Sequence, residues 1–139
     1  ISLMVEERGQ IKLEIVTPAK ILFSESADMV VISGGEGDFG VMLGHAPMLS
    51  QVRAGTIDIY DGDKVRTQIF VEGGIAEVTA ERCTVLAEEA VMVEDIDKPA
   101  AEERLQQARS AQNGDKDHVD GLDTPEVVAA DAQVAAISS

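Results

Sequence analysis

The sequence is short of three things: cysteine, basic residues and long apolar runs. Its single cysteine, Cys83, can form no intrachain disulfide, which favours a reducing compartment. Only 11 lysines and arginines stand against 26 acidic residues, a formal net charge of −15. This balance disfavours binding to nucleic acid or anionic lipid, since both depend on basic side chains. No apolar run approaches the roughly 20 residues of a membrane span, and the early acids Glu6 and Glu7 do not fit a secretion signal.

The first part of the chain has the pattern of β-strands. From residue 11 to about residue 87, short runs alternate between apolar and polar residues, as Ile11, Leu13 and Ile15 do with their neighbours. This alternation predicts an antiparallel β domain, a sandwich or flattened barrel of about six to ten strands. Asp61-Gly62 predicts a tight hairpin turn, because glycine adopts the positive φ needed there. Further strands are expected at 21–23, 28–32, 56–60, 65–71, 75–79 and 83–87.

After residue 90 the composition changes to Ala, Glu, Gln and Arg, which tolerate helix. Asp97 is the predicted N-cap of a first helix that ends near Asn113-Gly114. Thr124 is the predicted N-cap of a second helix, with proline in its first position. Thin apolar stripes predict a weakly held helical hairpin that is a candidate for movement. The stripes consist of Ala101, Leu105 and Ala108 on the first helix, and Val127, Ala130, Val134 and Ile137 on the second.

Charge divides near the same boundary. Residues 1–87 hold 13 acidic and 7 basic side chains, a net charge of −6, while residues 88–139 hold 13 and 4, a net charge of −9. The shorter part is therefore the more acidic one. We expect a flexible N-terminal extension over residues 1–10, a β-sandwich domain over 11–90 and an acidic helical hairpin domain over 91–139.

A glycine-rich segment resembles a nucleotide site at first sight. Gly35, Gly37 and Gly40 satisfy the G-x-G-x-x-G pattern of dinucleotide-binding loops. That pattern requires a helix to begin at the third glycine, and the residues that follow here make a poor start for a helix. Glu36 and Asp38 would also repel phosphate from inside the loop. We interpret the segment as a loop at the end of the sandwich, a common place for protein contacts.

Residues suited to catalysis are sparse. His45 and His118 fall in separate predicted domains. A dyad of His45 with Cys83 stays open, although Cys83 occupies an alternating strand where a small core residue is expected. A metal site or an enzyme active site built from His45 with Glu36 and Asp38 is the least favoured hypothesis, because their spacing specifies no geometry. No catalytic residue and no resident metal are predicted.

Four blocks of sequence, at 34–47, 49–55, 70–78 and 84–90, resemble the epsilon subunit of bacterial F-type ATP synthase, called delta in mitochondria. The blocks occur in the right order and spacing, and Gly-His-Ala-Pro at 44–47 is the most specific of them. The resemblance covers almost all of residues 11–112. It implies a ten-stranded β-sandwich followed by a C-terminal α-helical hairpin. The implied function is that of a non-catalytic rotor subunit, which links the gamma subunit to the c ring and couples proton flow to ATP synthesis at the cytoplasmic face of the bacterial inner membrane.

The resemblance also implies contact residues. Acids near the polar loops of the c ring would complement the basic side chains common there; the matching positions are Glu36, Asp38 and Phe39. Three further positions match residues that face gamma, although for the last of them a place in the core stays open: Thr17, His45 and Leu49. One departure is Leu43, which replaces the proline usual before Gly-His-Ala-Pro and predicts a less rigid loop. A stand-alone β-sandwich protein-binding module is the alternative, distinguished by whether the protein co-purifies with gamma and c subunits.

In relatives the hairpin can extend and inhibit ATP hydrolysis, partly through basic residues that meet the catalytic subunits. Here no Lys or Arg follows Lys116, so electrostatic inhibition is expected to be weak or absent. Some relatives bind regulatory ATP on the hairpin through an Ile/Leu-Asp motif followed by arginines. Ile96 and Asp97 match its start and Arg104 is one of two arginines left, but Ala100 stands where the phosphate-pairing arginine belongs. No cofactor is predicted, and regulatory ATP is a minor alternative.

Overall fold

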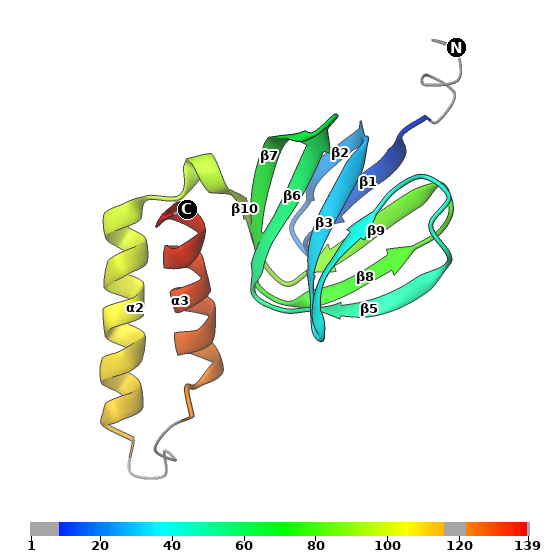
Figure 1. Ribbon diagram of the computed structural model, residues 1–139. Helices are drawn as coiled ribbons and strands as arrows, with labels where there is room; N and C mark the ends of the chain where they lie inside the picture. The colour runs from blue at the N-terminus through cyan, green and yellow to red at the C-terminus, as the bar shows by residue number, and fades with distance from the viewer. Residues whose placement is uncertain (1–8, 116–121, 139) are drawn as a thin grey trace.

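The computed structural model describes residues 9–115 and 122–138. Within them, ten β-strands come first, and a short 3-10 turn and two helices follow (Figure 1). The predicted architecture, a ten-stranded sandwich followed by a helical hairpin, is confirmed. Residues 1–8 of the predicted extension, and His118, lie outside the described residues.

The strands are short and follow one another closely. Their bounds are β1 (Ile11–Val16), β2 (Ile21–Ala27), β3 (Met29–Gly34), β4 (Gly37–Val41), β5 (Met48–Val52), β6 (Gly55–Asp61), β7 (Lys64–Val71), β8 (Gly74–Val78), β9 (Arg82–Ala87) and β10 (Ala90–Met92).

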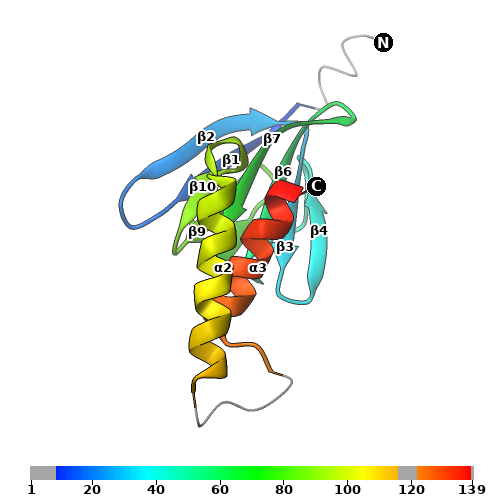
Figure 2. The same ribbon diagram turned by 90° about the vertical axis from the view of Figure 1, so that its left-hand side faces the viewer.

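The strands form two layers joined where β3 passes from one to the other. Their order is β10-β7-β6-β3-β5-β8-β9-β1-β2, with β4 paired to β3. β3 pairs with β6 along its first half and meets β5 only at Gly34 opposite Val52. One layer therefore contains β10, β7, β6, β3 and β4, and the other contains β5, β8, β9, β1 and β2 (Figure 1; β4 is labelled in Figure 2).

Apolar and polar residues alternate along the strands, and the inward-facing apolar side chains of the two layers form the core between them. In β1 the side chains of Ile11, Leu13 and Ile15 are fully buried, while Lys12 and Glu14 point to the other face and are half-buried. The same period of two recurs in β6, β8 and β9. The cluster is aliphatic except for one phenylalanine and one cysteine: Ile11, Leu13, Ile15, Phe23, Ala27, Val30, Ile32, Val41, Val52, Ile57, Ile59, Ile69, Val71, Ala76, Val78, Cys83, Val85 and Ala87.

The predicted hairpin turn at Asp61-Gly62 is confirmed. β6 and β7 pair as an antiparallel hairpin around it, and Gly62 has a φ of 66°. The Gly62 N–H donates to a carboxylate oxygen of Asp28 at 2.5 Å, which ties the turn to the start of β3. This hydrogen bond, helped by one from Gln10, holds the pKa of Asp28 below its usual value.

One interpretation of the sequence needs correction. The glycine-rich segment, taken as a loop, contains the strand β4, which pairs with β3 from Val41 opposite Val30 to Gly37 opposite Gly34. Its glycines hid the alternation, in which Val41 is buried and Phe39 half-buried while their neighbours are exposed. β5 was also absent from the predicted strands, although one face of it points inward at Val52.

A 3-10 turn, η1 (Val93–Asp95), leads from the sandwich to α2 (Lys98–Asn113) and α3 (Pro125–Ser138). The two helices lie side by side on the β6-β7-β10 side of the sandwich (Figures 1 and 2). The Val127 N–H donates to Thr124 Oγ1 at 3.3 Å, so the predicted N-cap of α3 is confirmed. Asp97 is the N-cap residue of α2 but makes no side-chain capping bond. Neither described helix is long and apolar enough to cross a membrane.

Candidate functional site

The glycine-rich segment folds as the tip of the β3–β4 hairpin. Gly34 and Gly37 face each other across the turn, and Gly37 has a φ of 138°, which side chains other than hydrogen rarely allow. Glu36 and Asp38 are exposed on either side of Gly37. No helix begins here, so the dinucleotide pattern has no structural basis. The tip instead presents two carboxylates to solvent at one end of the sandwich.

Phe39 lies next to the tip, where its ring packs against Gly34. Unlike the two acids, it is half-buried and packs against the core. Its ring lies so close to Gly34 that a Cβ there would approach the ring to 2.8 Å, which explains the glycine. Of the three residues predicted to contact the c ring, two are therefore exposed acids and the third holds their backbone in place.

A residue that the sequence analysis did not single out, Arg53, joins the tip to the end of β5. Its Nη2 donates to Asp38 Oδ1 at 2.6 Å, and its Nη1 donates to the Gly34 carbonyl at 2.6 Å. Its backbone N–H also donates to the Ser33 carbonyl at 2.9 Å. One of the two predicted acids is thus already paired within the chain, while no ion pair of Glu36 is present among the described side chains.

A cleft of about 540 Å³ runs between the tip and β5. It brings together residues that the resemblance assigned to different partners, since Glu36 and Asp38 line it with Leu49. Leu49 is 69% exposed, which settles the open alternative: it is not a core residue.

His45 and Thr17 lie in turns away from the tip. The Gly44 N–H donates to the Ala80 carbonyl at 2.7 Å, which fixes the Gly-His-Ala-Pro turn to the β8–β9 connection. His45 is half-buried, and its Nδ1 lies 2.7 Å from the Ala46 carbonyl, to which it donates. Thr17 follows β1 and its hydroxyl donates to the Lys20 carbonyl at 3.2 Å. His45 is thus separated from the acidic tip by the length of β4.

The outer face of the β5-β8-β9-β1-β2 layer carries exposed apolar side chains. Ile75 on β8 pairs with Leu86 on β9, and Leu86 pairs with Val16 on β1, whose antiparallel partner is Ile21. Leu86 is 56% exposed, and Ile75 and Ile21 are exposed as well. Leu49 extends this row on β5. We call these five residues the apolar row.

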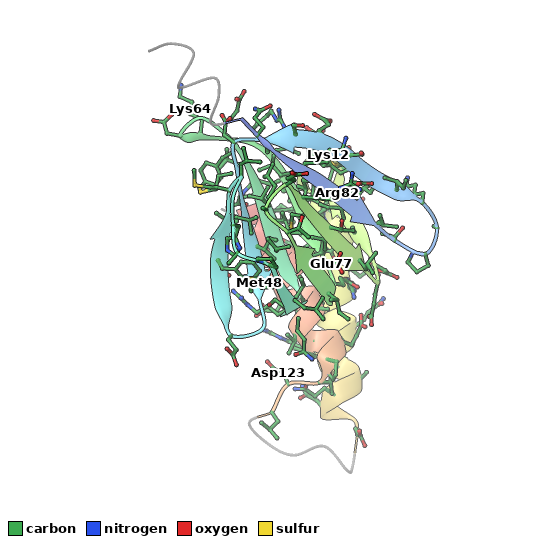
Figure 3. All side chains as sticks on the ribbon, turned by 90° about the vertical axis from the view of Figure 1, so that its right-hand side faces the viewer. Lys12, Met48, Lys64, Glu77, Arg82 and Asp123 are labelled. Atoms are coloured by element: carbon green, nitrogen blue, oxygen red, sulfur yellow. The ribbon has the colours of Figure 1, made fainter. Side chains whose placement is uncertain are left out.

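Charged residues border the apolar row. Figure 3 looks onto this face, with Glu77 on β8 and Arg82 on β9 labelled. Arg82 forms an ion pair with Glu14 at 3.0 Å. The helices lie behind the sandwich in this view, so they leave the apolar row uncovered (Figures 1 and 3). An apolar strip with a polar rim is typical of protein–protein interfaces.

The family model for the β-sandwich domain of the ATP synthase delta/epsilon chain matches residues 10–93. The chain belongs to this family. The ATP synthase epsilon chain of Paramagnetospirillum magneticum is 46% identical over 134 residues, which cover 93% of this chain and 98% of that one. The epsilon chain of Rhodospirillum rubrum is 53% identical over 97 residues, covering 70% and 72%.

Two solved structures of mitochondrial ATP synthases contain chains with a similar fold. A chain in the structure of the Euglena gracilis mitochondrial ATP synthase, which includes OSCP, F1 and the c ring, superposes with a TM-score of 0.68 at 25% identity and covers 91% of this chain and 74% of that one. A chain of the Tetrahymena thermophila central stalk and c ring gives 0.52 at 15% identity, covers 94% and 93%, and supports the fold alone. As an epsilon chain, the protein is a non-catalytic subunit of ATP synthase.

The alternatives that involve catalysis or metal do not fit an epsilon chain of this geometry. Cys83 is fully buried, and burial raises the pKa of its thiol from 9.0 to about 12, so the dyad with His45 has no thiolate nucleophile. The metal hypothesis for Glu36, Asp38 and His45 is wrong, because β4 separates the acids from the histidine. Across the described residues no group of three His, Cys, Asp or Glu side chains gathers as a metal site.

The residues of the nucleotide hypothesis line a different cleft, of about 650 Å³, between the hairpin and the sandwich. Ile96, Asp97 and Arg104 all border it. Arg104 is already engaged, since its Nη1 pairs with Glu72 after β7 and its Nε donates to Glu126 of α3 at 2.9 Å. These pairs, above all the hydrogen bond to Glu72, hold the pKa of Arg104 above its usual value.

The charge of this hairpin cleft is unfavourable for a polyphosphate. Five carboxylates border it against the one guanidinium: those of Glu72, Glu89, Asp95, Asp97 and Glu126. A nucleotide would have to displace two of them from Arg104 while the others repel it. Regulatory ATP therefore stays a prediction without added support.

The sequence analysis missed two arginines that organise these surfaces. Arg53 was counted only within a matched block, and Arg104 was considered only as a nucleotide ligand. Both pair with acids that are distant in sequence, Arg53 with Asp38 and Arg104 with Glu72. Neither pairing has a local spacing signal, because the tertiary arrangement of the strands and of α2, not sequence distance, brings the partners together.

Proposed function

We propose that this chain is a central-stalk rotor subunit of a proton-translocating F-type ATP synthase, which joins the gamma subunit to the c ring and couples proton flow to ATP synthesis. The observation that carries the proposal is the presence of two unlike exposed surfaces on one rigid sandwich. The apolar row covers one face, and the acidic tip stands at one end. A part that transmits torque between two partners needs two such surfaces on a stiff body.

The apolar row is the proposed docking surface for gamma. Leu49, which the resemblance assigns to gamma, belongs to it, and Thr17 follows directly on Val16 of the row. Burying exposed leucine and isoleucine side chains against a partner is favourable by about 25 cal/mol per Å² of apolar surface. His45 would contact gamma from the adjoining Gly-His-Ala-Pro turn, which the bond from Gly44 to Ala80 holds in place.

The acidic tip is the proposed docking surface for the c ring. Glu36 and Asp38 are exposed there and would attract the basic side chains of polar loops. The complex of the Euglena gracilis relative includes a c ring, which supports this assignment. The membrane association of this chain would then be peripheral, through the complex, at the cytoplasmic face of the bacterial inner membrane.

Two charge substitutions test the two surfaces separately. Leu86→Asp should abolish co-purification with gamma, whereas the matched Val65→Asp, at an exposed apolar position on β7 in the other layer, should not. Asp38→Lys together with Glu36→Lys should release the c ring but keep gamma. The matched control is Asp63→Lys, at an exposed acid in the β6–β7 turn. A chain that retains neither gamma nor c ring without any substitution would instead be a stand-alone protein-binding module.

The hairpin is proposed to inhibit ATP hydrolysis weakly or not at all through charge. α3 carries Glu126 and Asp131 and no basic residue, so it would repel an acidic segment of the catalytic alpha and beta subunits. ATP hydrolysis should be similar for complexes reconstituted with the full chain and with a chain ending near Glu94. Strong activation by the truncation would contradict this part of the proposal.

A further inference from the structure

We propose that Arg53 is a positioning residue of the c-ring contact: it orients Asp38 so that a cation of the partner meets the second carboxylate oxygen of Asp38 together with Glu36. This inference rests on the proposed function, in which the acidic tip docks on the c ring.

The guanidinium of Arg53 makes a forked pair of hydrogen bonds. Two nitrogens of one planar guanidinium donate at the same time, Nη2 to Asp38 Oδ1 and Nη1 to the Gly34 carbonyl, both at 2.6 Å. A planar guanidinium whose two Nη atoms are both hydrogen-bonded has little rotational freedom. The Asp38 carboxylate is held by a group that is itself tied to the backbone of the same hairpin.

Arg53 is itself anchored to Ser33 of β3 by two hydrogen bonds. Its N–H donates to the Ser33 carbonyl at 2.9 Å, and the Ser33 hydroxyl donates back to the Arg53 carbonyl at 3.1 Å. Ser33 is only 3% exposed, so this pair belongs to the interior of the sandwich. Two residues after Ser33, the Gly35 N–H donates to the Gln51 carbonyl at 2.9 Å. The backbone that carries the guanidinium is therefore hydrogen-bonded to β3, and the start of the tip is hydrogen-bonded to the end of β5.

Arg53 neutralises the charge of the acidic tip only in part. Arg53 occupies Oδ1 of Asp38, and both side chains remain about half exposed, 48% for Arg53 and 60% for Asp38. A carboxylate accepts at both oxygens, so Oδ2 can receive a second cation. Glu36 is exposed beside it, so the tip offers a partner two acceptors, Oδ2 of Asp38 and the Glu36 carboxylate, next to one fixed cation, the Arg53 guanidinium. A partner lysine or arginine is attracted, while Arg53 opposes the close approach of several cations at once.

The test measures the affinity of the gamma complex that contains the full chain for c rings, at low and high salt. Asp38→Asn and Arg53→Gln should each weaken binding by about threefold at low salt, the range of exposed charge pairs. The double variant should bind no more weakly than either single variant, because each single substitution already removes the pairing of Arg53 with Asp38. Arg53→Lys should behave as Arg53→Gln, since lysine keeps the charge but not the fork.

Melting temperatures distinguish a positioning role of Arg53 from a merely structural one. If Arg53 were only structural, Arg53→Gln would lower the melting temperature, and its effect on c-ring binding would be independent of the effect of Asp38→Asn. If Asp38→Asn weakens binding and Arg53→Gln leaves it unchanged or tightens it, the inference is overturned and the c-ring contact stands. Wild-type affinity of Arg53→Lys also overturns it, because charge alone would then suffice. If neither Asp38→Asn nor Glu36→Gln affects binding, the proposed c-ring contact itself fails.

Discussion

The sandwich and the hairpin are stabilised by different interactions. The sandwich encloses a cluster of buried isoleucine, valine and leucine side chains, most of them fully inaccessible. The corresponding cluster in the hairpin comprises Ala108, Val127 and Ala130, with Leu105 packed against it. Alanine buries little apolar surface, so this small cluster contributes far less to stability than the core of the sandwich. The hairpin needs other contacts to remain in place.

Those contacts include ion pairs. Arg104 of α2 reaches Glu72 on the sandwich and Glu126 on α3, and its Nη1 also donates to Gln133 of α3 at 3.2 Å. A single side chain thus links both helices and the sandwich. Its pairs are partly shielded from solvent, since the Glu72 side chain is 15% exposed and that of Arg104 28%. Loss of core volume should therefore destabilise the sandwich together with the hairpin that packs on it, whereas loss of the Arg104 charge should destabilise the hairpin alone.

The largest expected effect comes from removing core volume. Ile59→Ala should lower the free energy of unfolding by about 2–5 kcal/mol, because Ile59 is fully buried and the cavity would not collapse completely. Both domains should lose stability, since α3 contacts β6 and depends on it. Urea denaturation followed by circular dichroism measures the change.

Ile59→Val is the matched control, with an expected cost of about 0.5–1.5 kcal/mol. Equal costs for the valine and alanine variants would contradict the view that tight packing of the core stabilises the sandwich.

Removing charge should affect the hairpin alone. Arg104→Gln should destabilise the docked hairpin by about 1–2 kcal/mol, less than a fully buried pair because Arg104 remains partly exposed. Amide hydrogen exchange should become faster in α2 and α3, while β1 and β6 keep their protection. High salt should produce part of the same effect in the unaltered protein.

Arg109→Gln provides the control, because Arg109 pairs with Asp131 at 3.8 Å with both side chains more than half exposed. This variant should change hairpin exchange very little. If Arg104→Gln and Arg109→Gln behave alike, Arg104 is not the residue that links the hairpin to the sandwich.

The same contrast explains which parts of the fold followed from the sequence. Alternation in strands such as β1 and β9 is visible because their inward residues are large and aliphatic. β4 was missed because Gly37 and Gly40 interrupt the pattern and only Phe39 and Val41 contact the interior. The helices were found from their caps and composition, which are local signals.

A candidate surface could be predicted from the sequence only where neighbouring residues of one type form it. The acids Glu36 and Asp38 could be recognised from the sequence, and both are exposed as expected. The apolar row could not, because its members come from five strands whose order the sequence does not state. For the same reason Arg53 could not be assigned to Asp38, which lies 15 residues away.

The smallest expected effect distinguishes the two helix starts. Thr124 caps α3 through its hydroxyl, which accepts from the Val127 N–H, whereas the Asp97 side chain makes no such bond at the start of α2. Thr124→Ala should therefore lower hairpin stability by about 0.5–1 kcal/mol, and Thr124→Ser should restore most of it. Asp97→Ala should cost less than Thr124→Ala, although both residues have the sequence signature of an N-cap. Hydrogen exchange in the first turn of each helix measures the difference. Equal losses at the two positions would contradict this ranking, because the charge of Asp97 would then stabilise the start of α2 through the helix dipole as much as the Thr124 hydrogen bond stabilises the start of α3.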